Sequence, residues 1–155
     1  MEKQADLLHL KRDIHEALTT RLRQEIAAMK EELQSVQLSA NNETKSSAGD
    51  KYETGRAMAQ LEIEKLTGLL LEKEKALAFA AGLSLDAMDS VRPGSLAVTS
   101  MGHFYVTVNG GEFNMKSMKI RCISPASPLA VAMREKRAGD TFDLMQKRQT
   151  VSAVI

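Results

Sequence analysis

Residues Ser39–Gly49 read SANNETKSSAG, a polar run that contains no large apolar side chain. Asn, Ser and Gly favour turns, and they add no large apolar surface to a helical stripe, so such a run interrupts a helix. Long segments with helical periodicity lie on both sides of it. The sequence therefore predicts two helices joined by a turn in this region.

The segment before the interruption predicts one long helix. Its apolar residues recur at three- and four-residue steps with charged residues between them, which is the spacing of a helical stripe. From Glu2 to Leu38 there is neither Pro nor Gly, so a helix of roughly 55 Å is expected at about 1.5 Å per residue. The stripe consists of Leu7, Leu10, Ile14, Leu18, Leu22, Ile26, Met29, Leu33 and Val36.

The segment after the interruption predicts a second helix that ends near Gly82, a residue suited to a helix C-cap. Two amphipathic helices of similar length bury their stripes by folding back on each other, with coiled-coil-like packing. We therefore predict an antiparallel helical hairpin over residues 1–82, with its tip near 39–53. A parallel coiled coil between two chains is the competing arrangement, but the polar interruption favours a turn. The second stripe consists of Ala59, Ile63, Leu66, Leu70 and Leu77.

The remaining residues, 83–155, predict a small β-rich domain. Val, Ile, Thr, Phe and Tyr concentrate there in short segments, which is typical of strands. Turn signals lie at Arg92-Pro93-Gly94 and at Asn109-Gly110-Gly111. The expected fold class is thus α+β. The strand candidates are Ser95–Ser100, His103–Val108, Lys119–Ser124, Thr141–Met145 and Thr150–Ile155.

One short helix is expected inside this domain. Ser127 can cap its start and Pro128 suits the first helical position. The side chains of Leu129 and Met133 then either enter the core or form a surface patch to which a partner docks. The sequence leaves both alternatives open. Gly139-Asp140 is expected to turn the chain into the next strand.

Composition narrows the function classes. Lys and Arg number 21 and Asp and Glu 20, so the overall charge gives no reason to expect strong attraction to nucleic acid or anionic lipid. Aromatic residues make up 4% of the chain, which disfavours base-stacking platforms and aromatic-lined pockets. No nucleophile elbow, Gly-rich phosphate loop or His-Glu-x-x-His motif occurs, so independent catalysis and a cofactor of its own have little support.

The number of cysteines and the N-terminal residues indicate the cellular compartment in which the protein is expected. Cys122 is the single cysteine, so it cannot form an internal disulfide and a reducing environment fits. Met1–Lys11 carries charges within its apolar pattern, and neither a signal peptide nor a membrane span is visible. We expect a cytoplasmic protein without a membrane role.

Two local motifs resemble the GreA/GreB transcript cleavage factor family. Gly49-Asp50-Lys51-Tyr52-Glu53 resembles the family's Gly-Asp-x-x-Glu tip, and Ser127-Pro128-Leu129 followed by Lys136 and Gly139-Asp140 resembles its Ser-Pro helix and following turn. The order of the motifs along almost the whole chain adds to the resemblance. Two departures bear on activity more than on fold. Glu135 stands where the family often has Gly, and Thr54-Gly55-Arg56 replaces the usual continuation after the tip.

The resemblance implies an FKBP-like C-terminal domain and a partner, bacterial RNA polymerase. A factor of this family inserts its hairpin through the polymerase secondary channel while the globular domain docks outside. It then promotes cleavage of backtracked nascent RNA by the polymerase itself, so the factor is an accessory protein rather than an enzyme. The resemblance thus implies only indirect contact with nascent RNA, and with DNA, inside the elongation complex.

Asp50 and Glu53 are the candidate catalytic and metal-binding residues. Two-metal hydrolysis needs a second ion near the first, and Mg²⁺ prefers oxygen ligands while keeping several waters, so one or two carboxylates delivered from outside can suffice. The Mg²⁺ ion would be shared transiently with the polymerase. The alternative is structural, because Asp-x-x-Glu at a helix start resembles a capping box. Glu43 is a further acid in the tip.

Candidate partner-binding residues lie in and beside the short helix: Ser127, Pro128, Leu129, Met133 and Lys136. Three other functions stay open. A protein of this scaffold could regulate polymerase without stimulating cleavage, or the long helices could serve a coiled-coil adaptor. A prolyl isomerase is suggested only by the FKBP-like implication and is opposed by the lack of an aromatic pocket.

Overall fold

The structure is a computed structural model that describes the backbone of residues 2–43 and 50–155 and the side chains of residues 3–42 and 53–155. It confirms the predicted fold class. Two long helices, α1 (Glu2–Glu43) and α2 (Asp50–Ala81), precede a six-stranded sheet with one short helix. None of the described helices is long and apolar enough to cross a membrane.

Both long helices end close to their predicted limits. Gly82 donates from its N–H to the carbonyl oxygens of Ala78 and Phe79, so it closes α2 as expected. Helix α1 continues to Glu43, beyond the predicted end at Leu38. Adding residues to a formed helix costs little compared with nucleating it, so a short polar tail extends readily. The rest of the predicted turn, residues 44–49, lies outside the described residues.

Residues Thr20–Leu77 form one compact unit, the antiparallel helical pair. Leu22, Ile26 and Leu66 are buried along its seam, as the predicted stripes require. Ion pairs also join the helices. Lys73 contacts Glu25 at 2.7 Å and Lys30 contacts Glu74 at 3.7 Å. The intramolecular hairpin is therefore confirmed.

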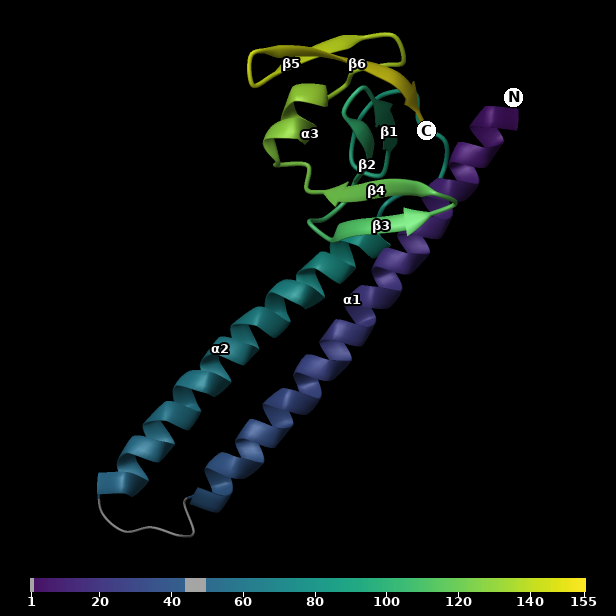
Figure 1. Cartoon of the computed structure of the whole chain (residues 1–155). Helices are drawn as coiled ribbons and strands as arrows, with labels where there is room; N and C mark the ends of the chain where they lie inside the picture. The colour runs from purple at the N-terminus through teal and green to yellow at the C-terminus, as the bar shows by residue number, and fades with distance from the viewer. Residues whose placement is uncertain (1, 44–49) are drawn as a thin grey trace. The chain divides into compact units, whose positions relative to one another are not determined.

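The second compact unit comprises Met1–Thr19 and Ala78–Ile155. The change from helical to strand-rich sequence near residue 83 thus does not separate the compact units, because the base of each helix packs with the sheet. The strand order is β3-β4-β2-β1-β6-β5, with β2 and β4 parallel and the other neighbours antiparallel (Figure 1). The strands are β1 (Leu96–Thr99), β2 (Gly102–Val106), β3 (Gly111–Met115), β4 (Met118–Ile123), β5 (Thr141–Leu144) and β6 (Lys147–Val154).

Five of these strands were expected, and β3 is the one that the sequence analysis missed. It begins at Gly111, inside the predicted turn Asn109–Gly111, and buries only Phe113 fully. Its hairpin with β4 turns through Lys116 and Ser117, both at positive φ (49° and 65°). Such turns usually carry Asn or Gly, so this pair gives no turn signal in the sequence.

The sheet buries residues on two faces because strand side chains alternate. On one face Ala97, Phe104 and Val106 join a core that includes Ala130 and Met133 of helix α3 (Pro128–Met133). On the other face lie buried Leu96, Tyr105, Ile120 and Cys122, and the buried residues of the α1 base are Leu10, Lys11, Ile14, Leu18 and Thr19.

Helix α3 begins as predicted. The Ser127 hydroxyl oxygen accepts a hydrogen bond from the Ala130 N–H at 3.2 Å, and Pro128 occupies the first turn. After α3 the chain passes through Glu135 at φ 62° and Gly139 at φ 94° before β5. The predicted turn at Gly139–Asp140 is confirmed, since the Asp140 N–H donates to the Arg137 carbonyl at 3.0 Å and closes it.

Candidate functional site

The predicted catalytic acids lie at the start of α2. Glu53 sits in the first turns of this helix, and its side chain is exposed. Asp50 is the first residue of the helix, but its side chain lies outside the described residues, as does that of Glu43. The arrangement of Asp50 with Glu53, and with it the choice between metal ligand and helix cap, therefore stays a prediction.

Helical geometry determines which side chain lies next to Glu53. Arg56 follows three positions later, so both side chains project from the same face of α2, and both are exposed. Among the side chains of residues 3–42 and 53–155, no three His, Cys, Asp or Glu groups lie close enough together to hold a metal ion.

The predicted docking residues around α3 differ in how far their side chains are buried. Met133 is 0% exposed and belongs to the core, so its side chain cannot reach a partner in this structure. Leu129 is partly buried against the same core. Pro128 is exposed, and Lys136 is partly exposed. Burial in this core favours the core alternative for Met133, and the partner-binding role of the residues around α3 stays a prediction.

Lys11 is a structurally important residue that the sequence analysis missed. Its side chain is 0% exposed, and its Nζ atom donates to the main-chain oxygens of Asp86 at 2.7 Å and Ile155 at 3.2 Å. Burial lowers the pKa of Lys11 to about 8, against a smaller opposing effect of the Asp86 charge. The signal was present in the sequence, because Lys11 falls on the stripe four positions after Leu7.

A second polar contact joins α1 to the sheet a turn further on. The Nδ1 atom of His15 lies 2.9 Å from the hydroxyl oxygen of Tyr105, and the two rings meet edge to face at a centroid distance of 6.2 Å. Tyr105 is fully buried, and this burial raises the pKa of its hydroxyl well above the ordinary value. Tyr105 therefore remains neutral and acts as a structural anchor for the helix.

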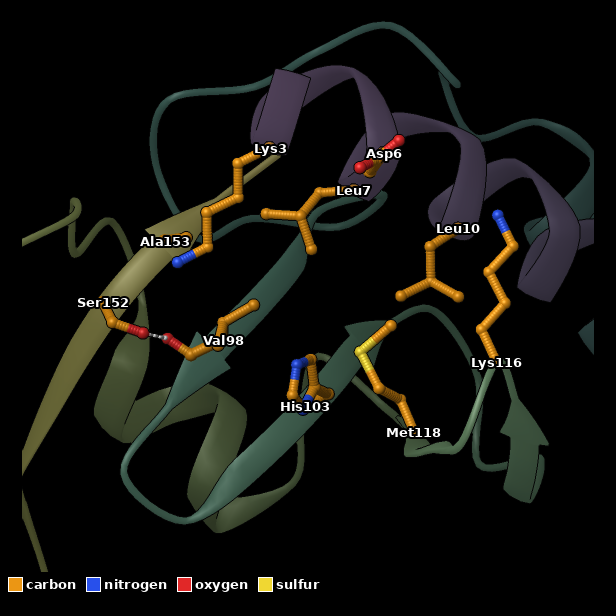
Figure 2. A pocket seen from close by; sticks show the side chains of 10 residues that line it. All are labelled: Lys3, Asp6, Leu7, Leu10, Val98, His103, Lys116, Met118, Ser152 and Ala153. Atoms are coloured by element: carbon orange, nitrogen blue, oxygen red, sulfur yellow. Dashed lines mark hydrogen bonds between the residues drawn. The ribbon is translucent and has the colours of Figure 1, made fainter. Parts of the chain in front are cut away.

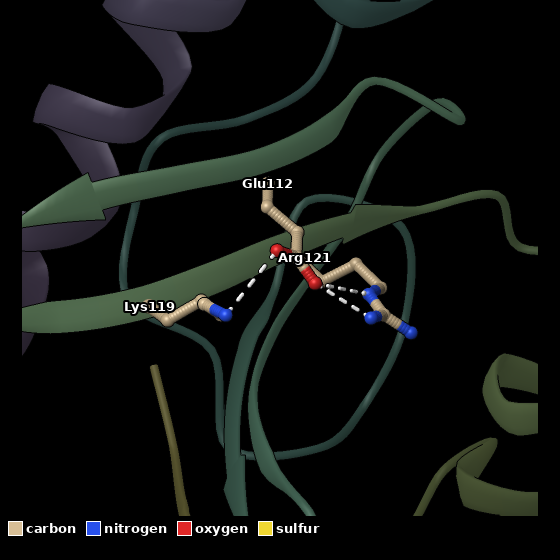
Figure 3. Close-up of polar contacts among 3 residues, drawn as sticks. All are labelled: Glu112, Lys119 and Arg121. Carbon is tan, nitrogen blue, oxygen red and sulfur yellow. Dashed lines mark hydrogen bonds and ion pairs between the residues drawn. The ribbon is translucent and has the colours of Figure 1, made fainter.

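A charged cluster is formed by exposed side chains of strands β3 and β4. Glu112 accepts two hydrogen bonds from Arg121, at 3.2 and 2.6 Å, and pairs with Lys119 at 3.6 Å (Figure 3). The bonds from Arg121 lower the pKa of the Glu112 carboxyl. Since all three side chains are largely solvated, this cluster is a cross-strand contact of small energetic weight rather than a site.

Comparisons with known proteins give a limited result. No family model and no curated protein matches the chain. A solved structure described as that of the transcription factor Gfh1 is 22% identical, with a TM-score of 0.38, and the match covers 89% of this chain and 93% of that chain. The GreA factor homolog 1 (Gfh1) protein of Thermus thermophilus is 20% identical, with a TM-score of 0.36 and coverage of 88% and 94%. At these scores neither structure identifies the function of this chain.

Proposed function

We propose that this chain is a secondary-channel factor of bacterial RNA polymerase that promotes cleavage of backtracked nascent RNA and so rescues stalled elongation complexes. One observation carries the proposal. The helical pair Thr20–Leu77 is a compact unit of its own, and the acidic start of α2 follows the described end of α1 at Glu43. Residues 20–43 span roughly 36 Å as a helix, which is long enough to carry the tip deep into a channel.

The helical pair has the properties of a stiff probe. Its seam is closed by the buried side chains Leu22, Ile26 and Leu66, and ion pairs join its two helices at Glu25 and Glu74. A pair that packs against itself needs no partner to keep its shape, so its two helices are pre-organised before binding. Pre-organisation of this kind suits a factor that must deliver one or two side chains to a distant site.

The chemistry at the tip fits the ion that such a polymerase uses. Glu53 offers an exposed carboxylate, and Asp50 is the second acid of the motif. Carboxylate oxygens are ligands that Mg²⁺ accepts, and a second magnesium ion supplies the activated water and charge neutralisation of two-metal hydrolysis. The task of this chain would be to position the two acids, while the polymerase holds the RNA and breaks the bond. The chain itself would then be an accessory factor and not an enzyme.

A non-cleaving regulator of the same scaffold is the second candidate, and Arg56 favours it. Its guanidinium projects from the same helix face as Glu53. A positive charge beside Glu53 repels a magnesium ion, whereas a metal-binding site gains affinity from further anionic groups. Such a protein would occupy the channel without helping to hold magnesium. A coiled-coil adaptor would instead form stable oligomers and show no affinity for polymerase.

The test is RNA cleavage in backtracked elongation complexes over a magnesium titration. The test variant is the double substitution Asp50→Asn and Glu53→Gln, because each change removes a charged oxygen while nearly preserving shape. Glu72→Gln is the matched control, since Glu72 is an exposed acid further along α2. Polymerase affinity and hairpin helicity are recorded in parallel.

We expect the double variant to bind polymerase normally and to lose stimulated cleavage, with the largest defect at low magnesium. The Glu72→Gln control should cleave as the unmodified chain does. Asn and Gln both retain capping capacity, so a purely structural role would tolerate both changes. Wild-type cleavage by the double variant removes the two acids from the mechanism. Tight binding without cleavage by the unmodified protein establishes the non-cleaving regulator instead.

A further inference from the structure

A pocket of about 410 Å³ lies between the base of α1 and the sheet face that this helix covers (Figure 2). Both walls belong to the unit formed by Met1–Thr19 and Ala78–Ile155. The volume falls in the range of small-molecule sites, which is roughly 300–1,000 Å³. None of the roles proposed above uses this pocket.

The body of the pocket is mostly apolar, and His103 of β2 also lies in its lining. Leu7 and Leu10 contribute from α1, and Val98, Met118 and Ala153 contribute from three strands. Val98 and Ala153 are direct cross-strand partners, and the register between β1 and β6 shifts immediately beyond Val98. This irregularity places Ser152 at the edge of the pocket, where its hydroxyl donates to the Val98 carbonyl oxygen at 3.0 Å and is thereby satisfied.

The charges of the pocket lie around its rim. Figure 2 shows Lys3 and Lys116 at opposite ends of the lining, with the amine of Lys3 beside Ser152 and Ala153. Among the described residues neither lysine has an ion-pair partner, and Asp6 is the one carboxylate in the lining. Two lysines against one acid leave the rim with an excess of one positive charge.

We propose that this pocket binds a small organic anion with an apolar body, such as a medium-chain carboxylate. The apolar walls take the body out of water, which is the main source of affinity, while an unpaired lysine at either end offers a partner to the anionic group. A neutral molecule of the same shape would leave both lysines without a partner. An organic cation would meet a net repulsion at the rim. The charge of the lining therefore selects among molecules that fit its volume.

The probe for this proposal is 8-anilinonaphthalene-1-sulfonate, which joins an apolar ring system to one sulfonate and fluoresces when it leaves water. N-phenyl-1-naphthylamine is its neutral counterpart. The full-length chain is labelled at its methionine methyl groups and titrated with each probe by NMR, with fluorescence recorded alongside. Met118 lines the pocket, whereas Met58 and Met145 are exposed elsewhere and report non-specific binding.

We expect the Met118 methyl signal to shift on titration with the sulfonate, while those of Met58 and Met145 stay in place. The double variant Lys3→Gln and Lys116→Gln should weaken sulfonate binding roughly three- to thirtyfold, as expected for two solvated charge contacts. Lys147→Gln, at an exposed lysine outside the lining, is the matched control and should bind as the unmodified chain does. Ala153→Leu fills the pocket and should exclude both probes.

Two further experiments distinguish a free anionic amphiphile from an anionic lipid surface as the source of the ligand. Decanoate, compared with decanol, should displace the sulfonate if a free amphiphile is the ligand. Vesicles of phosphatidylglycerol should displace it, and should sediment the chain in a manner that depends on Lys3 and Lys116, if the anion belongs to a lipid surface. An unchanged Met118 signal, equal affinity for the neutral probe, or indifference to the lysine substitutions would each overturn the proposal. The lysine variants keep the test decisive even if Ala153→Leu unfolds, because both lysines lie on the surface.

Discussion

The Nζ atom of Lys11 donates a hydrogen bond of 3.2 Å to the main-chain oxygen of Ile155, 144 positions further along the chain. With the bond to Asp86 it ties the first helix to the residue that follows the last strand, β6, and to the segment that precedes the first strand. The base of α1 is therefore part of the β-rich domain rather than an appendage to it. Its buried charge also makes the stability of the domain depend on pH.

We predict that Lys11→Met removes one component of this pH dependence. The pKa of Lys11 is about 8 in the folded chain and 10.5 for an ordinary lysine, so between these values the unfolded state binds more protons. Stability should then rise with pH through this window, by at most about 3 kcal/mol, and be flat in this component below pH 8. Urea unfolding of both proteins between pH 7 and 10.5 measures the difference. If the free energy of unfolding changed with pH equally in both proteins, Lys11 would not be the source of this pH dependence.

Glu135→Gly should stabilise the β-rich domain by about 1 kcal/mol. Glu135 has a φ of 62°, which strains a residue with a Cβ, and its N–H donates to the Val91 carbonyl at 2.8 Å. Glycine keeps this bond and removes the strain, while its greater freedom in the unfolded chain offsets part of the gain. Glu135→Ala is the control, since it removes the charge but keeps the strain. Equal stabilisation by alanine would place the effect in the charge.

Gly110→Ala should destabilise the chain by about 1–3 kcal/mol, as overpacking of a core does. A Cβ at this position would overlap with the Cδ1 atom of Leu18, whose side chain is 0% exposed. Leu18→Ala makes room for the added methyl group, so the two substitutions together should cost less than the sum of their separate effects. Chemical denaturation of the two single variants and the double variant tests this coupling. If the destabilisation of the double variant equalled the sum of the two single effects, the added methyl group would not press on Leu18.

The β-rich domain should need the base of α1 in order to fold. The sequence alone suggested that residues 84–155 form a complete domain, but Leu10, Ile14 and Leu18 are buried in the same compact unit as the sheet. A fragment of residues 84–155 should show poorly dispersed amide signals. A chain in which residues 20–77 are replaced by about six Gly and Ser residues should fold, since packed helices lie about 8–10 Å apart and such a linker spans that distance. A well-folded 84–155 fragment would refute this dependence.

The same shortened chain tests which part of the protein carries the proposed polymerase binding. If the β-rich domain supplies most of the affinity, the shortened chain should compete with the full-length chain for polymerase while stimulating no cleavage. The exposed Pro128 is a suitable position for a docking variant, because its change leaves the buried Met133 in place. Loss of competition by a folded shortened chain would move the docking surface onto the helical pair.

The sequence by itself determined the helical pair, five of the six strands and the cap of α3. These features depend on local information: the spacing of Leu22 and Ile26 within one stripe, a Ser before a Pro, and the polar interruption that permits a turn. Periodicity decides which face of an element is apolar, and this is enough to predict that two long stripes pack on each other. The role of Asp50 and Glu53 rests on sequence alone.

Only the tertiary structure decided which partner each apolar face meets. Strand β3 carries a weak local pattern, and it forms because β4 offers it an unpaired edge. Lys11 lies on the apolar stripe of α1, but the partners of its buried amine come only from the assembled domain. The pocket beside Lys3 exists only because α1 crosses a sheet face built from strands far apart in the chain. The burial of Lys11 depends on contacts with residues 75 and 144 positions further along the chain. Local propensity carries no information about such contacts, since their energies arise only when the whole domain has assembled.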